Sequence, residues 1–178
     1  MNIEDAIFSR RTIYRFKTDV IEPGLLEEIL AAGLRAQNHR LTEPWRFTVV
    51  GPETHRALAG VYAALNPGTS RDAAAGKILS KPLLVAASVI LAGDAQRRRE
   101  DYAAACCAIQ IIQLMAWSRG VGMQWSTSPF TRSAKTYDLL HCNPEQEEII
   151  GILFFGYPAE VPDLPERKPL REVLRRVP

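Results

Sequence analysis

YAAACCAIQIIQLMAWSR, residues Tyr102–Arg119, is the longest helical pattern in the chain and the one around which the other elements are expected to pack. Small and apolar residues occupy most faces of the expected helix and charges are few, so we expect burial on nearly all sides. Such a helix is central to a domain or lies at an interface. We interpret Cys106 and Cys107 within it as small buried hydrophobes rather than redox groups. Gly120 and Gly122 end the pattern.

Shorter patterns lie on both sides of this helix and alternate between the helical and the strand type. Residues 66–80 are rich in small residues and weakly patterned, which predicts a mobile or partly helical excursion such as a lid. Arg97-Arg98-Arg99 is interpreted as a solvated loop. Helices intermixed with about four strands indicate a three-layer α/β or α+β protein, richer in helix than in strand. The predicted helices are Asn2–Ser9, Pro23–Gln37, Glu53–Leu65 and Ser133–Leu140, and the predicted strands are Trp45–Val50, Leu83–Gly93, Val121–Thr127 and Ile149–Phe155.

The bulk composition bounds the class of protein. A chain of 178 residues, 47% apolar and 24% charged, with no repeat or linker, predicts a single globular domain over residues 1–178. The net charge of +2 is too small to argue for nucleic acid. The acidic start and the shortness of the apolar stretch Leu83–Gly93 predict a cytoplasmic protein without a membrane span. With only three cysteines and three histidines, and no Cys-x-x-Cys pair, the sequence argues against a structural zinc site.

The octapeptide Ser9–Phe16, SRRTIYRF, gathers three arginines and the two aliphatic hydroxyls of Ser9 and Thr12 beside the first predicted helix. Arg10 and Arg11 can donate to the oxygens of one phosphate, and Thr12 can add a hydroxyl donor. A solvated basic turn is the alternative interpretation of the octapeptide taken alone. The two interpretations differ in whether an anion is required.

Several stretches together resemble the nitroreductase family, and most closely its compact, YdjA-like subgroup. The basic octapeptide is followed in order by Glu43-Pro44-Trp45-Arg46-Phe47, by the alanine-rich helix ending in Gly-x-Gly, by Ile150–Pro158 and by Arg167–Val173. No piece is specific alone, but the order covers nearly the whole chain. The resemblance implies an α+β fold with a mixed, mainly antiparallel sheet flanked by helices, bound FMN, and a homodimer with flavin sites between the subunits.

The resemblance also implies roles for individual residues. Arg10 and Thr12 match family positions at the phosphate and ribityl end of FMN, and Arg167 matches a C-terminal cation that joins them. Arg11 is a plausible partner in that cluster. Repulsion among these cations is relieved when an anion binds, which explains why distant segments both carry arginine.

Two positions depart from the common family pattern. Tyr14 stands where a Lys or Arg is usual near the N1 and O2 edge of the flavin, and Leu41 stands where an Asn is usual. Residues matching Arg35 and His39 hold the flavin in the compact subgroup, so both are candidates for the missing cation. The alternative for Arg35 is a helix C-terminal cation that interacts with the helix dipole.

The strand after the buried helix matches the family segment near the flavin ring. Trp125-Ser126-Thr127 is therefore expected to lie close to the dimethylbenzene and N5 region, with Trp125 read equally well as a core aromatic. Trp45 is expected to be structural packing.

The implied activity is hydride transfer from NAD(P)H to flavin and then to a nitroaromatic, quinone or similar electron-poor acceptor, in a ping-pong cycle. No protein nucleophile or base is needed, because the flavin carries the chemistry. Alternatives are a dehydrogenation or dehalogenation by a flavoenzyme of the same fold, a non-catalytic FMN-binding protein, or, least favoured, a basic surface for acidic partners.

Overall fold

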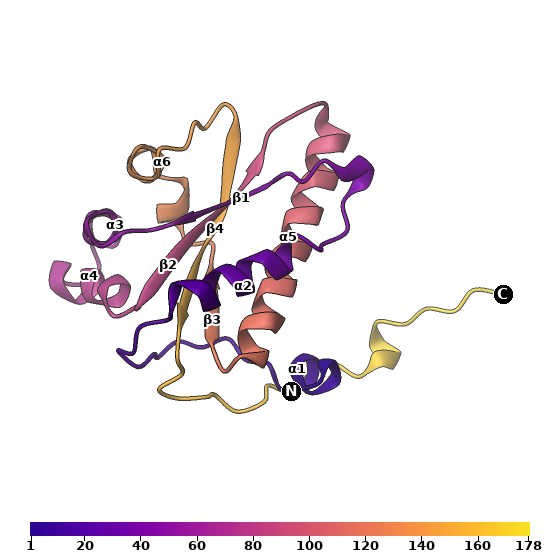
Figure 1. The fold of residues 1–178 in the computed structure, drawn as a ribbon. Helices are drawn as coiled ribbons and strands as arrows, with labels where there is room; N and C mark the ends of the chain where they lie inside the picture. Colours follow the sequence, from indigo (N-terminus) through magenta and orange to yellow (C-terminus); the bar gives the residue numbers. More distant parts are fainter.

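A four-stranded sheet organises the computed structural model, which describes residues 1–178 (Figure 1). All neighbouring strands pair antiparallel, and a single parallel bridge joins Thr12 to Met123 outside the named strands. Helices cover both faces, which confirms the α+β, three-layer fold expected from the sequence. The strands, in the spatial order β1-β2-β4-β3, are β1 (Trp45–Val49), β2 (Leu83–Ile90), β3 (Gly122–Ser126) and β4 (Glu147–Gly156).

The two central strands carry the core because they are covered on both faces. β2 and β4 pair from Leu83 with Phe155 to Ile90 with Glu147, with an irregularity between Ala87 and Ser88. Their continuous apolar runs are typical of strands without a solvent face. The sequence prediction for both strands is therefore confirmed, with ends shifted by one to three residues.

The helices form two layers, each with its own apolar cluster against one face of the sheet. One layer packs α2 and α5 on Val85, Leu153 and Phe155, and the opposite layer packs α3, α4 and α6 around Ile152 and Phe154. The bounds are α1 (Ile3–Ser9), α2 (Pro23–Gly33), α3 (Pro52–Ala64), α4 (Arg71–Leu79), α5 (Ala95–Ser118) and α6 (Ala134–Leu140), with 3-10 turns η1 (His39–Leu41), η2 (Pro129–Arg132) and η3 (Leu170–Glu172).

Helix α5 begins earlier than the apolar pattern predicts. Asp94 caps its first turn, because the Asp94 carboxylate accepts a hydrogen bond of 2.9 Å from the Arg97 amide. Arg97–Arg99 therefore lie inside the helix, and their interpretation as a loop is wrong. Within one chain α5 buries one face and leaves Tyr102 and Gln110 exposed, so the expected burial on nearly all sides is not reached.

Residues 66–80 form part of the helical layer and not a lid over a site. Ser70 caps α4 by accepting a hydrogen bond from the Ala73 amide, and Ala74 and Ile78 are buried against the sheet side. The small residues that weaken the sequence pattern allow α4 to lie close to α3. The expectation of a partly helical segment is confirmed, and that of a lid is not supported.

None of the helices combines the length and the apolar character that crossing a bilayer requires. Beyond β4 the chain leaves the sheet, and Figure 1 shows the C-terminal residues extending past α1 away from the body of the protein.

Gly151 on β4 is a position where a side chain cannot be added without displacement. A Cβ there would lie 2.0 Å from Nε1 of Trp125. We predict that Gly151→Ala lowers the free energy of unfolding by about 1–3 kcal/mol through overpacking. The matched control is Gly76→Ala in α4, where a Cβ meets nothing within 4 Å. Urea unfolding at equilibrium measures both, and equal midpoints for the two variants would contradict the prediction.

Candidate functional site

The basic segment is anchored to the sheet by its backbone. The Ile13 amide donates to the Met123 carbonyl at 3.2 Å, and the Lys17 amide donates to the Tyr157 carbonyl at 2.8 Å. Ile13 is fully buried, and a Cβ on Gly122 would lie 2.6 Å from its Cγ1. Glycine at position 122 therefore permits the close approach that places residues 10–12 beside the start of β3.

Three arginines gather where this segment leaves α1. Burial lowers the pKa of Arg10 from its ordinary value, and the nearby charges of Arg167 and Arg11 lower this pKa further. None of the three forms an ion pair with a carboxylate. The structure thus brings a residue more than 150 positions away in sequence to the N-terminal cations, and no carboxylate compensates their charge.

Three buried polar atoms without a hydrogen-bond partner lie on β3 or on the segments next to it. They are Nε of Arg11, Oε1 of Gln124 and Oγ of Ser128. Their segments are neighbours, because Thr12 forms a bridge with Met123 and Ser128 closely follows β3. Buried polar groups in proteins are nearly always paired, so three orphans together fit a polar, anionic ligand such as FMN. Sequence reasoning missed Gln124 and Ser128, since no local pattern marks their polar atoms as buried.

Trp125 has a clear packing role in the structure. Its Nε1 donates to the Ile150 carbonyl at 3.0 Å, and its ring covers Gly151. Ser126 beside it is half-buried and Thr127 is exposed at the end of the strand. The expected structural role of Trp45 is also confirmed, since it is buried in the core. The ring contacts that the resemblance implies for residues 125–127 stay a prediction.

A lysine that the sequence analysis did not single out lies beside the departure at Tyr14. The Lys81 ammonium donates to the Tyr14 carbonyl at 2.6 Å and lies 5.2 Å from the centre of the Phe16 ring. Burial lowers the pKa of Lys81, and no carboxylate pairs with it. The structure thus adds a partly desolvated cation next to the position where the family cation is absent.

His39 lies near the other end of α5, beside Glu100, whereas Arg35 follows Gly33, which lies against Ala108 and Ile112 in the middle of that helix; both side chains are exposed. Ser9 at the end of α1 accepts a hydrogen bond from Trp117, whereas Thr42 in the loop after His39 bonds to Asp101. At 1.5 Å of rise per residue, about 24 Å of helix separates these two points. One chain therefore does not bring His39 to the Arg10 cluster.

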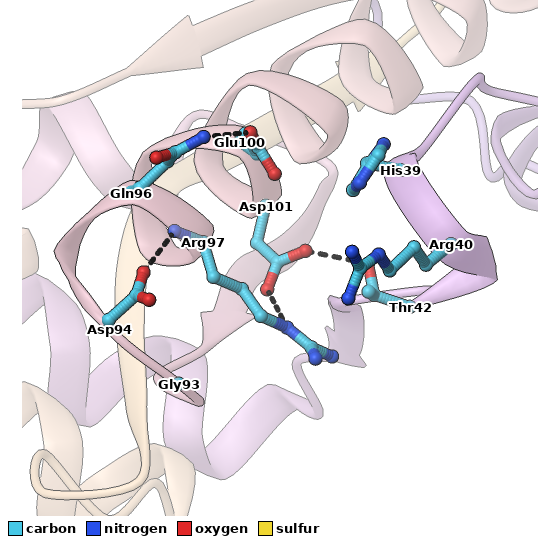
Figure 2. Close-up of a pocket in the computed structure, with 9 residues that line it drawn as sticks. All are labelled: His39, Arg40, Thr42, Gly93, Asp94, Gln96, Arg97, Glu100 and Asp101. Carbon is cyan, nitrogen blue, oxygen red and sulfur yellow. Dashed lines mark hydrogen bonds and ion pairs between the residues drawn. The ribbon is translucent and has the colours of Figure 1, made fainter.

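His39 borders a polar cavity of about 400 Å³ between its loop and the start of α5 (Figure 2). No hydrophobic residue lines this cavity. Its lining residues are His39, Arg40, Thr42, Gly93, Asp94, Gln96, Arg97, Glu100 and Asp101.

The three cysteines are free thiols. Burial raises the pKa of Cys106, and burial with the neighbouring Glu147 raises the pKa of Cys142 to about 11. Both thiols are therefore protonated at neutral pH, which favours packing over redox chemistry.

Comparison with known proteins matches residues 7–157 to the nitroreductase family. The chain is 32% identical to a Bacillus subtilis protein provisionally named NAD(P)H nitroreductase YfhC, over 96% of this chain and 91% of that protein. It is 27% identical to Escherichia coli YdjA, provisionally named in the same way, over 89% of each.

Solved structures share the fold over nearly the full length. A nitroreductase-like family protein from Bacillus cereus superposes with a TM-score of 0.89 at 26% identity, covering 99% of this chain and 96% of that one. A provisionally named nitroreductase from Desulfovibrio desulfuricans, crystallised with FMN, superposes with a TM-score of 0.80 at 21% identity, covering 100% and 98%. Sequence match and fold agree, and this chain belongs to the nitroreductase family.

Proposed function

We propose that this nitroreductase-family oxidoreductase binds FMN, takes NAD(P)H as electron donor and reduces nitroaromatic, quinone or similar electron-poor acceptors. The observation that carries the proposal is the uncompensated cluster of Arg10, Arg11 and Arg167 against the start of β3. When bound, FMN would supply the hydride chemistry for a ping-pong cycle. The chain's own residues then have to bind it, orient it and tune its charge.

The phosphate end of FMN belongs at the arginine cluster. Arg10 and Arg11 can donate to phosphate oxygens, Thr12 can add a hydroxyl, and Arg167 can approach from the C-terminal segment. A bound dianion would offset the mutual repulsion that lowers the pKa of Arg10. The cluster is electrostatically unfavourable without its ligand, so relief of the repulsion contributes to the free energy of FMN binding.

The ring end of FMN belongs along the segment after β3. Trp125, Ser126 and Thr127 would border the ring, and the unpaired atoms of Gln124 and Ser128 are available donors and acceptors there. Lys81 is a cation candidate for the N1 and O2 edge, because it reaches the backbone of Tyr14. A cation at that edge would favour negative charge on the pyrimidine and so raise the reduction potential.

Arg35 and His39 would come from a second copy of the chain. The surface near α1 supports a homodimer, because Met1, Ile3, Ile7 and Phe8 are exposed and an apolar groove runs between α1, α2 and α5. Two-fold symmetry presents the same patch on both copies, so each copy can complete the other's site. The FMN found in the Desulfovibrio desulfuricans structure and the name of YfhC support cofactor and donor.

Reduction by NAD(P)H tests the function directly. We predict that the purified protein is yellow and that anaerobic NADH or NADPH bleaches its flavin absorbance within hand-mixing time, with nitroaromatic or quinone restoring the colour.

Each of the other outcomes would support one of the alternative functions. A colourless protein that takes up no added FMN would refute every flavin hypothesis. A yellow protein that neither donor bleaches would be a non-catalytic FMN-binding protein. Bleaching without reoxidation by these acceptors would indicate another reaction of the same fold.

The phosphate assignment is tested by Arg10→Ala. We predict that this change weakens FMN binding by about 10- to 100-fold, the effect of removing one charged hydrogen-bond donor. Arg15→Ala is the matched control, since Arg15 belongs to the same segment but is exposed and pairs with Glu160. Titration of flavin-depleted protein, followed by flavin fluorescence, gives both affinities. An unchanged affinity for Arg10→Ala would refute the assignment.

A site shared between two copies predicts complementation. Arg10→Ala and a double variant of Arg35→Ala with His39→Ala should each bind FMN weakly. When the two are unfolded and refolded together, random pairing gives intact sites at about a quarter of positions, one in every mixed dimer. FMN titration should then reveal that tight fraction. Its absence from a refolded mixture that contains mixed dimers would refute the shared site.

A further inference from the structure

The loop that carries His39 has an unusual backbone. Arg40, Leu41 and Glu43 have φ values of 56°, 53° and 42°, although none is glycine. A side chain with a Cβ disfavours this left-handed region. Three such residues among four persist only where surrounding contacts over-determine the conformation. The contacts that impose this shape therefore decide where the loop presents its side chains.

Two contacts fix the loop from different directions. Asn38 holds its base locally, because its Oδ1 accepts from the Glu43 amide at 3.0 Å. Thr42, the one residue of 40–43 with a negative φ, reaches out of the loop and donates its hydroxyl to Oδ1 of Asp101 at 2.6 Å. The second contact joins residues 59 positions apart and is the tie between the loop and α5.

Asp101 is suited to act as an anchor. Its side chain is only 4% exposed, and its other oxygen accepts an ion-pair contact of 3.5 Å from Nε of Arg97, one helical turn earlier. A buried carboxylate holds its hydrogen-bond donors strongly, because losing one leaves charge unpaired in a low-dielectric site. Arg97 holds the Asp101 carboxylate in place on the helix, and the hydrogen bond from Thr42 ties the loop to that carboxylate.

Figure 2 shows the side chains that the loop places beside Asp101. His39 and Arg40 extend from the loop toward Asp101 across the cavity, and neither residue forms an ion pair of its own. Both side chains are exposed, so the positions of their Cα and Cβ atoms are set by the backbone of the loop. The neighbouring Glu100 lines the same cavity, but it accepts from Gln96 on its own helix and has no hydrogen bond to the loop.

We propose that Asp101 is a positioning residue that acts through Thr42: it holds Arg40, Leu41 and Glu43 in their left-handed conformation and so fixes the direction in which His39 meets the flavin. The proposal deepens the proposed function and rests on it, because the flavin contact of His39 belongs to that function. Asp101 itself touches neither cofactor nor substrate.

Thr42 offers the sharpest test, since it lies on the surface side of the contact. Thr42→Val keeps the shape and removes the donor, Thr42→Ser restores the hydroxyl, and Glu100→Gln alters a cavity carboxylate outside the contact. Asp101→Asn is the companion change on the helix. Two measurements on the full-length protein are compared: the rate of tryptic cleavage after Arg40, followed by mass, and the FMN dissociation constant of flavin-depleted protein.

We expect Thr42→Val to speed cleavage after Arg40 and to weaken FMN binding, each by about tenfold, the effect of one charge-assisted hydrogen bond. Thr42→Ser and Glu100→Gln should stay within about twofold of the unchanged protein. Asp101→Asn should resemble Thr42→Val where it folds.

Cleavage at the unchanged rate in Thr42→Val would refute the anchor. Faster cleavage with unchanged FMN affinity would reduce the contact to a structural role and refute positioning. If the unchanged protein binds no FMN, the proposed function fails and the flavin role of Asp101 fails with it, while the cleavage rates still decide whether the anchor exists.

Discussion

The close approach of Ile13 to Gly122 is the constraint on which the candidate site depends. It lets the backbone of residues 12–17 pair with the start of β3 and with the segment after β4, as an added edge to the sheet. The arginines just before this edge are then held against the sheet by main-chain bonds and not by their own side chains. Their guanidinium groups stay free of carboxylates, so the positive charge is available to a ligand.

Helix α5 links the two halves of the site through its two ends. Its C-terminal end holds α1 through Trp117 and Ser9, and its N-terminal half holds the loop after His39 through Asp101 and Thr42. A rigid helix keeps these two groups apart within one chain, because its length exceeds what flexible side chains can span. The proposed site therefore takes its His39 from a second copy of the chain, which is why we propose a homodimer together with it.

The element types were predictable where apolar periodicity is strong, as in β2, β4 and α5. The predictions that failed concern segments in which local sequence patterns conflict with one another. Arg97–Arg99 resemble a solvated loop because three charges hide the helical start, although Asp94 is an N-cap residue. Residues 71–79 carry large apolar side chains only at Ile78 and Leu79, yet Ala74 and Ile78 suffice to hold α4 on α3. The N-cap at Asp94 decided the first case, and packing of α4 against α3 decided the second.

Residue order and local pattern are enough to indicate the family, the three-layer fold and the basic segment at Arg10–Thr12. It takes the tertiary structure to place Arg167 near Arg10 and Lys81 beside Tyr14, to bury the unpaired atoms of Gln124 and Ser128, and to keep His39 apart from the cluster. Each of these depends on contacts between distant segments, and no local pattern encodes which distant side chain will share a space.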